Sequence, residues 1–230
     1  MKIAFASARG RIQTERNLPC QDIAGGFADQ DLAAVVLADG AGSRKRAKES
    51  AECAVHTLLD YLRTRPLEKV TRKELWKTLC AAQKNTGLAP EDLGTTLVFA
   101  AAREGEYLAG HIGDGVILSG RKGSFQVLSG PENGRYINET CLLPDCGIKH
   151  FRLYRGNFGG SGSDSFLLAT DGAGGILYDR DGRGAEVCRL IDEANREDGR
   201  EECSAWLLEN LEDIFSQYSS DDKSLAVLSL

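Results

Sequence analysis

Long hydrophobic runs are missing from this chain of 230 residues: no apolar stretch approaches the roughly 20 residues that a membrane-spanning helix needs. The opening segment has one lysine before a very short apolar stretch, too short for the core of a signal peptide. An excess of positive charge is also missing, since 28 basic against 34 acidic residues give a net charge of −6. That balance argues against a general nucleic-acid binder. We therefore expect a cytoplasmic protein whose partners include neither a membrane nor nucleic acid.

Histidine is scarce, and the seven cysteines form no regular pattern. His56, His111 and His150 show no HExxH or similar spacing, which makes a histidine-based zinc site unexpected. The odd number and scattered positions of the cysteines argue against a disulfide framework. Cys141 and Cys146 are the only close pair, and CxxxxC alone is weak support for zinc.

The remaining composition is that of an ordinary globular protein, with 42% hydrophobic and 27% charged residues. A chain of this length can bury a full core, and no stretch has the composition of a linker. We therefore expect residues 1–230 to form a single domain.

Periodicity in the first half predicts alternating strands and helices. Apolar runs indicate strands at 3–8, 22–28 and 31–39. Helical spacing follows over about 44–63, with Ser43 as the expected N-cap, and Thr71 with Glu74 resembles a capping box that opens a helix through about residue 85.

The second half predicts a run of antiparallel strands and a final pair of helices. Short β-rich runs separated by glycine-containing turns lie between 94 and 130, and 129–147 is irregular, as expected of a loop or reduced flap. Strands at about 148–155 and 165–170, two helices and a terminal strand complete the chain. This order predicts an α+β fold, a four-layer αββα sandwich of two antiparallel sheets flanked by helices.

Two of the apolar runs end in nearly the same word, VVLADGAG at 35–42 and FLLATDGAGG at 166–175. Asp39 and Asp171 therefore both follow buried strands, and Asp22, Asp114 and Asp221 also lie at strand edges or tight turns. A partly desolvated carboxylate is costly without a cation or hydrogen-bond donors. A lone Asp-Gly is more often a turn or a cap than a ligand, but the whole set favours a site for two Mg²⁺ or Mn²⁺ ions.

Six segments, read in order, carry a resemblance to a known family: NLPCQD, LADGAGS, LGTTLVFA, IGDGVIL, LLATDGAGG and DDKSLAVL. Together they resemble the metal-dependent protein phosphatases (type 2C, serine/threonine), in particular a compact bacterial branch. The match spans about residues 4 to 230.

The resemblance implies a two-sheet sandwich with metals in a cleft at one edge. It implies that Asp39 bridges both ions, that the Gly40 carbonyl binds one of them, and that Asp171 and Asp221 hold the other. Asp22 is expected to reach the site through water. Asp114 matches the position of a weaker third metal. Asp221 is preferred over Asp222, because the first Asp of DDKS matches the family ligand.

The sequence also departs from the family pattern. The phosphate-binding arginine is expected five residues before Asp22, where this chain has Asn17, with Arg16 one step earlier. Gln21 replaces an acidic residue, and Ala41 stands where better-studied members carry a histidine that is a suggested general acid. The leaving alkoxide would then take its proton from metal-bound water or from an unidentified group.

A basic run, Arg44-Lys45-Arg46, follows the second motif. Its cations would oppose a helix dipole, which disfavours them locally. They form either a solvated face or a basic rim that attracts a phosphorylated substrate. With Arg16, Arg44 is our candidate for substrate binding.

The leading hypothesis is hydrolysis of phosphoserine or phosphothreonine in proteins by water bridging two Mn²⁺ or Mg²⁺ ions. Expected partners are a phosphorylated protein and a cognate kinase or its targets. The alternative is a catalytically weak scaffold that binds a phosphoprotein or kinase. An aspartic-protease dyad is disfavoured because Gly follows each Asp and because it leaves Asp22 and Asp221 unexplained. Cys20 lacks the Cys-x5-Arg spacing of a cysteine phosphatase.

Overall fold

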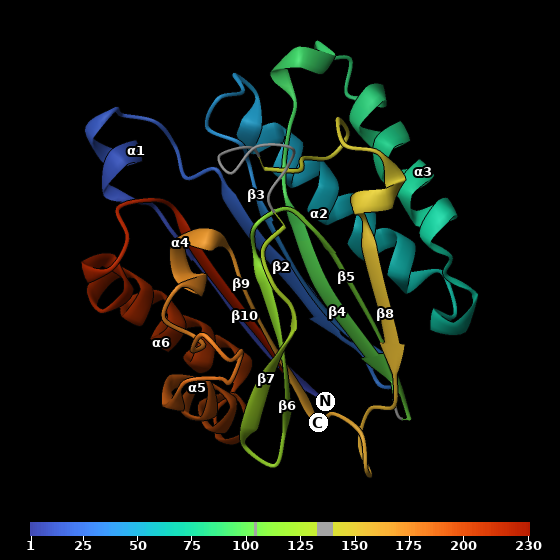
Figure 1. Cartoon of the computed structure of the whole chain (residues 1–230), viewed down its shortest axis with the longest axis vertical. Helices are drawn as coiled ribbons and strands as arrows, with labels where there is room; N and C mark the ends of the chain where they lie inside the picture. The colour runs from blue at the N-terminus through green and yellow to red at the C-terminus, as the bar shows by residue number, and fades with distance from the viewer. Residues whose placement is uncertain (104, 133–139) are drawn as a thin grey trace.

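The computed structural model describes residues 1–103, 105–132 and 140–230. Within these ranges two antiparallel sheets of five strands pack against each other (Figure 1). The strands are β1 (Lys2–Ala8), β2 (Asp22–Ala28), β3 (Ala33–Asp39), β4 (Leu97–Arg103), β5 (Glu106–Ile112), β6 (Val116–Arg121), β7 (Ser124–Ser129), β8 (Arg152–Gly156), β9 (Ser165–Ala169) and β10 (Lys223–Ser229). One sheet has the order β1-β10-β9-β6-β7 and the other β2-β3-β4-β5-β8.

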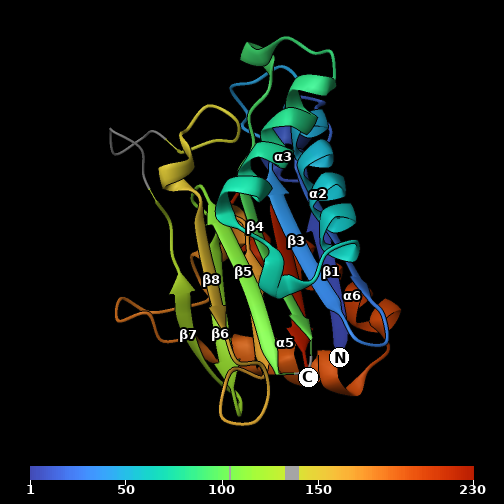
Figure 2. The same cartoon turned by 90° about the vertical axis from the view of Figure 1, so that its right-hand side faces the viewer.

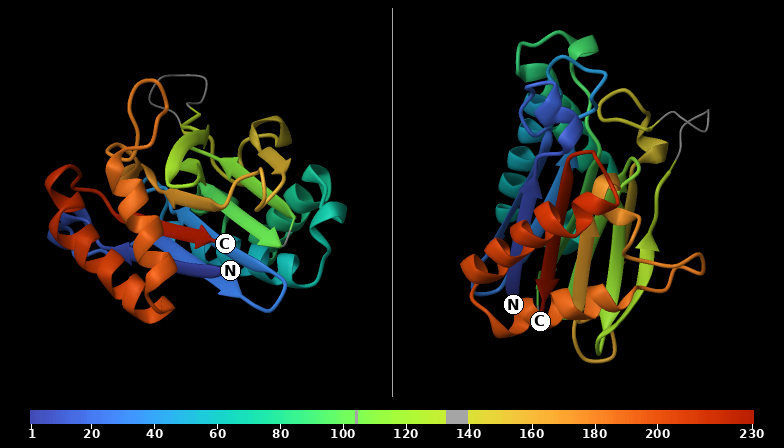
Figure 3. Two further views of the ribbon diagram at one scale, coloured as in Figure 1. Left: turned by 90° about the horizontal axis from the view of Figure 1, so that it is seen from below. Right: turned by 90° about the vertical axis from the view of Figure 1, so that its left-hand side faces the viewer.

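Helices cover the outer face of each sheet. The α-helices of the described residues are α1 (Arg11–Glu15), α2 (Ala47–Arg63), α3 (Arg72–Asn85), α4 (Asp171–Gly174), α5 (Glu186–Glu197) and α6 (Arg200–Asp213). The pair α2 and α3 lies over the sheet that contains β3 (Figure 2), and α5 and α6 lie over the sheet that contains β10 (Figure 3). The predicted α+β sandwich of helix, sheet, sheet and helix layers is therefore confirmed. No described helix has both the length and the apolar character to cross a membrane.

Three layers of core explain the long apolar runs of the sequence. In β3, Ala34 and Val36 face the helices while Val35 and Leu37 face the other sheet, and all four are fully buried. Because both faces of each sheet are covered, such strands are apolar on both sides and do not alternate with polar residues.

Strand register brings the predicted aspartates to one end of the sandwich. Asp22, at the start of β2, lies opposite Asp39, at the end of β3. In the other sheet Ala169, at the end of β9, lies opposite both Val116 at the start of β6 and Leu225 near the start of β10. The two chain termini lie side by side at the opposite end (Figure 1).

The capping box of the second helix is confirmed at its N-cap: the Glu74 backbone N–H donates to the Thr71 hydroxyl at 3.2 Å, and α3 begins at Arg72. The prediction of Ser43 as an N-cap was wrong. The first long helix begins at Ala47, because residues 41–46 instead form turns in which the backbone of Arg46 bonds to the Asp92 carbonyl.

Other differences concern short elements. The strand expected from residue 148 begins only at Arg152, after a 3-10 turn at Ile148–His150. Helices α1 and α4 were not predicted, since five and four residues are too few for helical periodicity to register. Of the expected flap at 129–147, residues 133–139 lie outside the described residues.

Candidate active site

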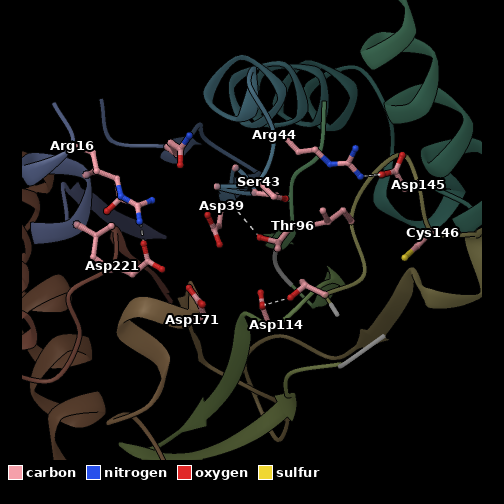
Figure 4. A pocket seen from close by; sticks show the side chains of 18 residues that line it. Arg16, Asp39, Ser43, Arg44, Thr96, Asp114, Asp145, Cys146, Asp171 and Asp221 are labelled. Carbon is pink, nitrogen blue, oxygen red and sulfur yellow. Dashed lines mark hydrogen bonds and ion pairs between the residues drawn. The ribbon is translucent and has the colours of Figure 1, made fainter. Parts of the chain in front are cut away.

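A pocket of about 680 Å³ opens at the end of the sandwich where the aspartates gather. Five of the six predicted ligands line it, and they come from segments that are far apart in the chain: Asp39, Gly40, Asp114, Asp171 and Asp221. Figure 4 shows the carboxylates of Asp39, Asp114, Asp171 and Asp221 facing one shared space. Arg16 and Arg44 also line the pocket, on opposite sides.

Asp39 is held through its backbone by the start of the neighbouring strand. Its N–H donates to the Thr96 hydroxyl at 3.1 Å, and its carbonyl accepts from the Thr96 N–H at 2.8 Å and from the Thr95 hydroxyl at 2.9 Å. These bonds leave the carboxylate to face the pocket. At the next residue, Gly40, a Cβ would lie 2.4 Å from the Ala47 carbonyl oxygen, so only glycine fits there.

Asp39, Asp114 and Asp171 form the centre of the site. One carboxylate oxygen from each lies within 4.8 Å of those of the other two, close enough for a shared metal ion. Asp114 lies in the β5–β6 turn and accepts from the Thr140 hydroxyl at 2.7 Å. Asp171 is the first residue of α4, directly after β9.

Asp22 lies behind this group and does not line the pocket. It is 3% exposed, and its Oδ2 accepts from the Thr170 hydroxyl at 2.7 Å. The same hydroxyl accepts from the Ser224 backbone N–H of its own sheet, so the bond from Thr170 to Asp22 connects the two sheets behind the site. Asp22 is therefore separated from the pocket, and its action through water stays a prediction.

The two aspartates of DDKS point in different directions. Asp221 lines the pocket, where its Oδ1 accepts from the Gln13 amide at 2.9 Å. Asp222 is buried instead, and its two oxygens accept from the backbone N–H groups of Gly10 at 2.7 Å and Gln21 at 2.6 Å. Asp222 thus ties three separate segments together, while Asp221 faces the site.

Burial and mutual repulsion change how these carboxylates titrate. Burial, together with the charges of Asp22, Asp171 and Asp114, holds the pKa of Asp39 well above its ordinary value. Burial raises the pKa of Asp22 to about 7, although hydrogen bonds from Thr170 and Ser224 act to lower it. Asp171 keeps an exposed edge, yet partial burial and the charges of Asp114 and Asp221 raise its pKa to about 6.

The donor set fits a hard divalent cation. Three buried oxygen acceptors in and behind the pocket have no hydrogen-bond partner: Asp22 Oδ1, Asp114 Oδ1 and Gln13 Oε1. Carboxylate and amide oxygens without donors are the ligands that Mg²⁺ and Mn²⁺ prefer. The crowding that raises the carboxyl pKa values is relieved when a cation is bound.

The two pocket arginines differ in their pairing. Arg44 forms an ion pair with Asp145 and donates to the Glu91 carbonyl at 2.8 Å. Arg16 is exposed and has no acidic partner within 4.0 Å among the described residues. It ends α1 just before Asn17, whose φ of 53° suits asparagine better than most residues. The residue at the expected arginine position, Asn17, therefore adopts the backbone conformation that the turn requires. Among the described residues, the unpaired positive charge at this side of the pocket belongs to Arg16.

Several residues of the site were not predicted. Thr140 and Asp145 lie within the irregular segment 129–147, which has no recognisable motif, and Gln13 lies on a helix too short to predict. Only the Gly-Thr-Thr of residues 94–96 could be found from the sequence, because it belongs to one of the family-like segments. The sequence did not indicate what its hydroxyls bind.

Comparison with known proteins agrees with this geometry. The sequence matches protein phosphatase 2C over residues 9–212, which is most of the chain. The chain belongs to the protein phosphatase 2C family. The resemblance seen in the sequence and the expected class of enzyme, a protein phosphatase, are therefore confirmed. A search of curated proteins finds no match.

Solved structures share the fold of this phosphatase at low sequence identity. A bacterial serine phosphatase superposes with a TM-score of 0.71 at 16% identity, covering 100% of this chain and 97% of the other. Serine/threonine phosphatase Stp1 from Staphylococcus aureus gives 0.69 at 16%, covering 100% and 95%. The catalytic domain of the serine/threonine protein phosphatase PstP, in complex with two manganese ions, gives 0.66 at 18%, covering 98% and 96%.

The different roles of Asp221 and Asp222 predict unequal effects of the same substitution on stability. Asp222→Asn places an amide N–H₂ against one of two backbone donors, whichever way the amide turns, so we expect a loss of about 2–4 kcal/mol of unfolding free energy. Asp221→Asn can keep its acceptor toward Gln13 and removes one charge from the cluster, so we expect little loss. Urea unfolding in EDTA measures both. Equal losses would contradict this assignment.

The raised carboxyl pKa values predict a pH dependence of the metal-free phosphatase. Folded Asp22 and Asp171 hold protons at pH values where the unfolded chain, with pKa near 3.8, has lost them. The unfolding free energy in EDTA should therefore fall as the pH rises from about 4 to about 7, by at least about 2 kcal/mol.

Urea unfolding at several pH values, with EDTA and with Mn²⁺, tests this dependence. Saturating Mn²⁺ and Asp39→Asn should each flatten the slope, because both reduce the repulsion. A stability in EDTA that is constant or rises over this range would overturn the explanation.

Proposed function

We propose that this phosphatase hydrolyses phosphoserine and phosphothreonine in proteins, with two Mn²⁺ or Mg²⁺ ions bound in the pocket. The observation that carries the proposal is the convergence of Asp39, Asp114 and Asp171, whose oxygens lie within 4.8 Å of one another. A cluster of this kind without a cation is costly, and the raised pKa values of Asp39 and Asp171 reflect that cost.

The proposed ligand roles follow the family resemblance. Asp39 holds both ions, the Gly40 carbonyl contributes to one, and Asp171 with Asp221 holds the other. Asp22 acts through water from its buried position, and Asp114 serves a weaker third ion. The ions would lower the pKa of a water that bridges them, making it the nucleophile, and would polarise the phosphoryl group. The PstP structure with two manganese ions supports this choice of metal.

Arg16 is the proposed phosphate-binding residue. Its guanidinium lacks an acidic partner among the described residues and lines the same pocket as Asp221, where it can neutralise phosphoryl oxygens as charge builds up in the reaction. Arg44 contributes less directly, because Asp145 and the Glu91 carbonyl occupy its guanidinium. It shapes the opposite rim, where a phosphorylated protein enters.

A second candidate is a catalytically weak scaffold that binds a phosphoprotein or kinase. Ala41 favours it, because this residue lines the pocket without a protic side chain for the leaving alkoxide. We favour the enzyme, in which water supplies that proton. We further propose that residues 1–230 act as one domain in the cytoplasm on the targets of a cognate kinase.

Metal dependence is the first test. With Mn²⁺, we expect turnover of p-nitrophenyl phosphate and a phosphothreonine peptide. EDTA should abolish it, and Asp39→Asn should lower kcat by at least about 100-fold, because its charge holds both ions. Asp60→Asn, an exposed aspartate on α2, is the control and should leave kcat unchanged. Binding of phosphopeptide without turnover would favour the scaffold, and turnover that persists in EDTA would overturn the proposal.

Comparison with its neighbour Arg11 shows whether Arg16 contacts the phosphate or only contributes positive charge to the surface. Arg16→Ala should raise KM for the phosphothreonine peptide about tenfold, because a charge-assisted contact to phosphate is lost. Arg11→Ala removes an exposed cation on the same helix that does not line the pocket, and should change KM less than twofold. Steady-state kinetics at fixed Mn²⁺ measures both. Equal effects would indicate long-range attraction instead of contact, and an unchanged KM would exclude Arg16.

A further inference from the structure

Gln13 is a buried polar residue on a helix that is otherwise largely exposed. It lies on α1, where Arg11, Thr14 and Glu15 face solvent, yet it is only 8% exposed and lines the pocket. The helix is fastened beside the site by its backbone, since the Ile12 N–H donates to the Ser220 carbonyl at 3.1 Å. This short segment therefore delivers one side chain to the carboxylates.

One end of the Gln13 amide orients Asp221. Its Nε2 donates to Asp221 Oδ1 at 2.9 Å. The same oxygen also accepts from the Asp222 backbone N–H at 2.9 Å. An ionised carboxylate only accepts hydrogen bonds, which assigns the nitrogen of the amide to this side. With two donors on Oδ1, the second oxygen of Asp221 is left for the pocket.

The other end of the amide has no partner. Gln13 Oε1 is buried without a hydrogen bond, a loss that typically costs about 1–3 kcal/mol. The unpartnered oxygens of Asp114, in the same pocket, and of Asp22, behind it, are in the same state. Gln13 Oε1 lies among other hydrogen-bond acceptors, so its donor has to come from outside the protein. A water molecule bound to a divalent cation is such a donor.

We propose that Gln13 belongs to the metal site. Its Nε2 positions Asp221, and its Oε1 accepts a hydrogen bond from water carried by the cation that Asp221 holds. The ligand class is a hydrated hard divalent ion, Mn²⁺ or Mg²⁺. This inference rests on the proposed function, in that it requires the pocket to bind such ions.

A purely structural role makes a different prediction. If Gln13 only fastens α1, its removal lowers stability and leaves metal affinity unchanged. If Gln13 is an outer ligand of the metal site, its removal lowers the affinity for Mn²⁺ by roughly 10–100-fold, the usual effect of losing such a partner. Metal binding by the protein without substrate distinguishes the two roles.

The test is calorimetric titration of the full chain with Mn²⁺, beside urea unfolding in EDTA. Gln13→Ala should weaken one Mn²⁺ site by roughly 10–100-fold while the others keep their affinity. Thr14→Ala, an exposed neighbour on α1, is the matched control and should bind as the wild type does. Gln13→Glu places a second negative charge beside Asp221. This variant should therefore have a lower unfolding free energy than the wild type in EDTA, and Mn²⁺ should restore its stability.

Each outcome is decisive. Wild-type Mn²⁺ affinity in Gln13→Ala overturns the proposal and leaves the metal site intact. Failure of the wild type to bind Mn²⁺ overturns the proposed function itself, and this inference with it. Should Gln13→Ala not fold, Gln13→Asn replaces it: the shorter amide cannot reach both partners, so it should show the same selective loss of affinity.

Discussion

Repulsion among carboxylates at one end of the sandwich is the constraint on which the rest of the site depends. Asp39, Asp114 and Asp171 share a small space, with Asp22 behind them and Asp221 beside them. Each follows or precedes a strand whose two faces are packed, so the backbone cannot move apart to relieve the charge. The fold therefore stores an electrostatic cost, and in the proposed function a divalent cation removes that cost, which gives the site its affinity for metal.

Neutral hydroxyls hold the acids without cancelling their charge. Thr96 binds the backbone of Asp39, Thr140 binds one oxygen of Asp114, and Thr170 binds one oxygen of Asp22. A lysine or arginine in these places would occupy the carboxylates and compete with a metal. Contacts outside the pocket offset the free energy lost to this repulsion. One of them is Asp222, which joins segments near β1, β2 and β10 through backbone N–H groups.

Helix α1 carries both sides of the proposed chemistry. Gln13 faces the carboxylates, and Arg16, three residues later, faces the open pocket as the one lining cation that has no acidic partner among the described residues. On the opposite rim Arg44 is neutralised by Asp145. In the proposed function, the pocket thus has one acidic wall for metal and one cation for phosphate.

The sequence alone determined the two-sheet sandwich and the identity of the aspartates, because strand periodicity and short motifs are local properties that survive without contacts. It placed the N-cap of α2 at Ser43, three residues too early, because turn contacts with residues near Asp92 lie outside any local window. Only the tertiary structure decided that Asp221 faces the pocket while Asp222 fastens the backbone, and that Arg44 is paired while Gln13 is buried. These assignments depend on partners up to 212 residues away, and such pairings arise only when the chain is folded.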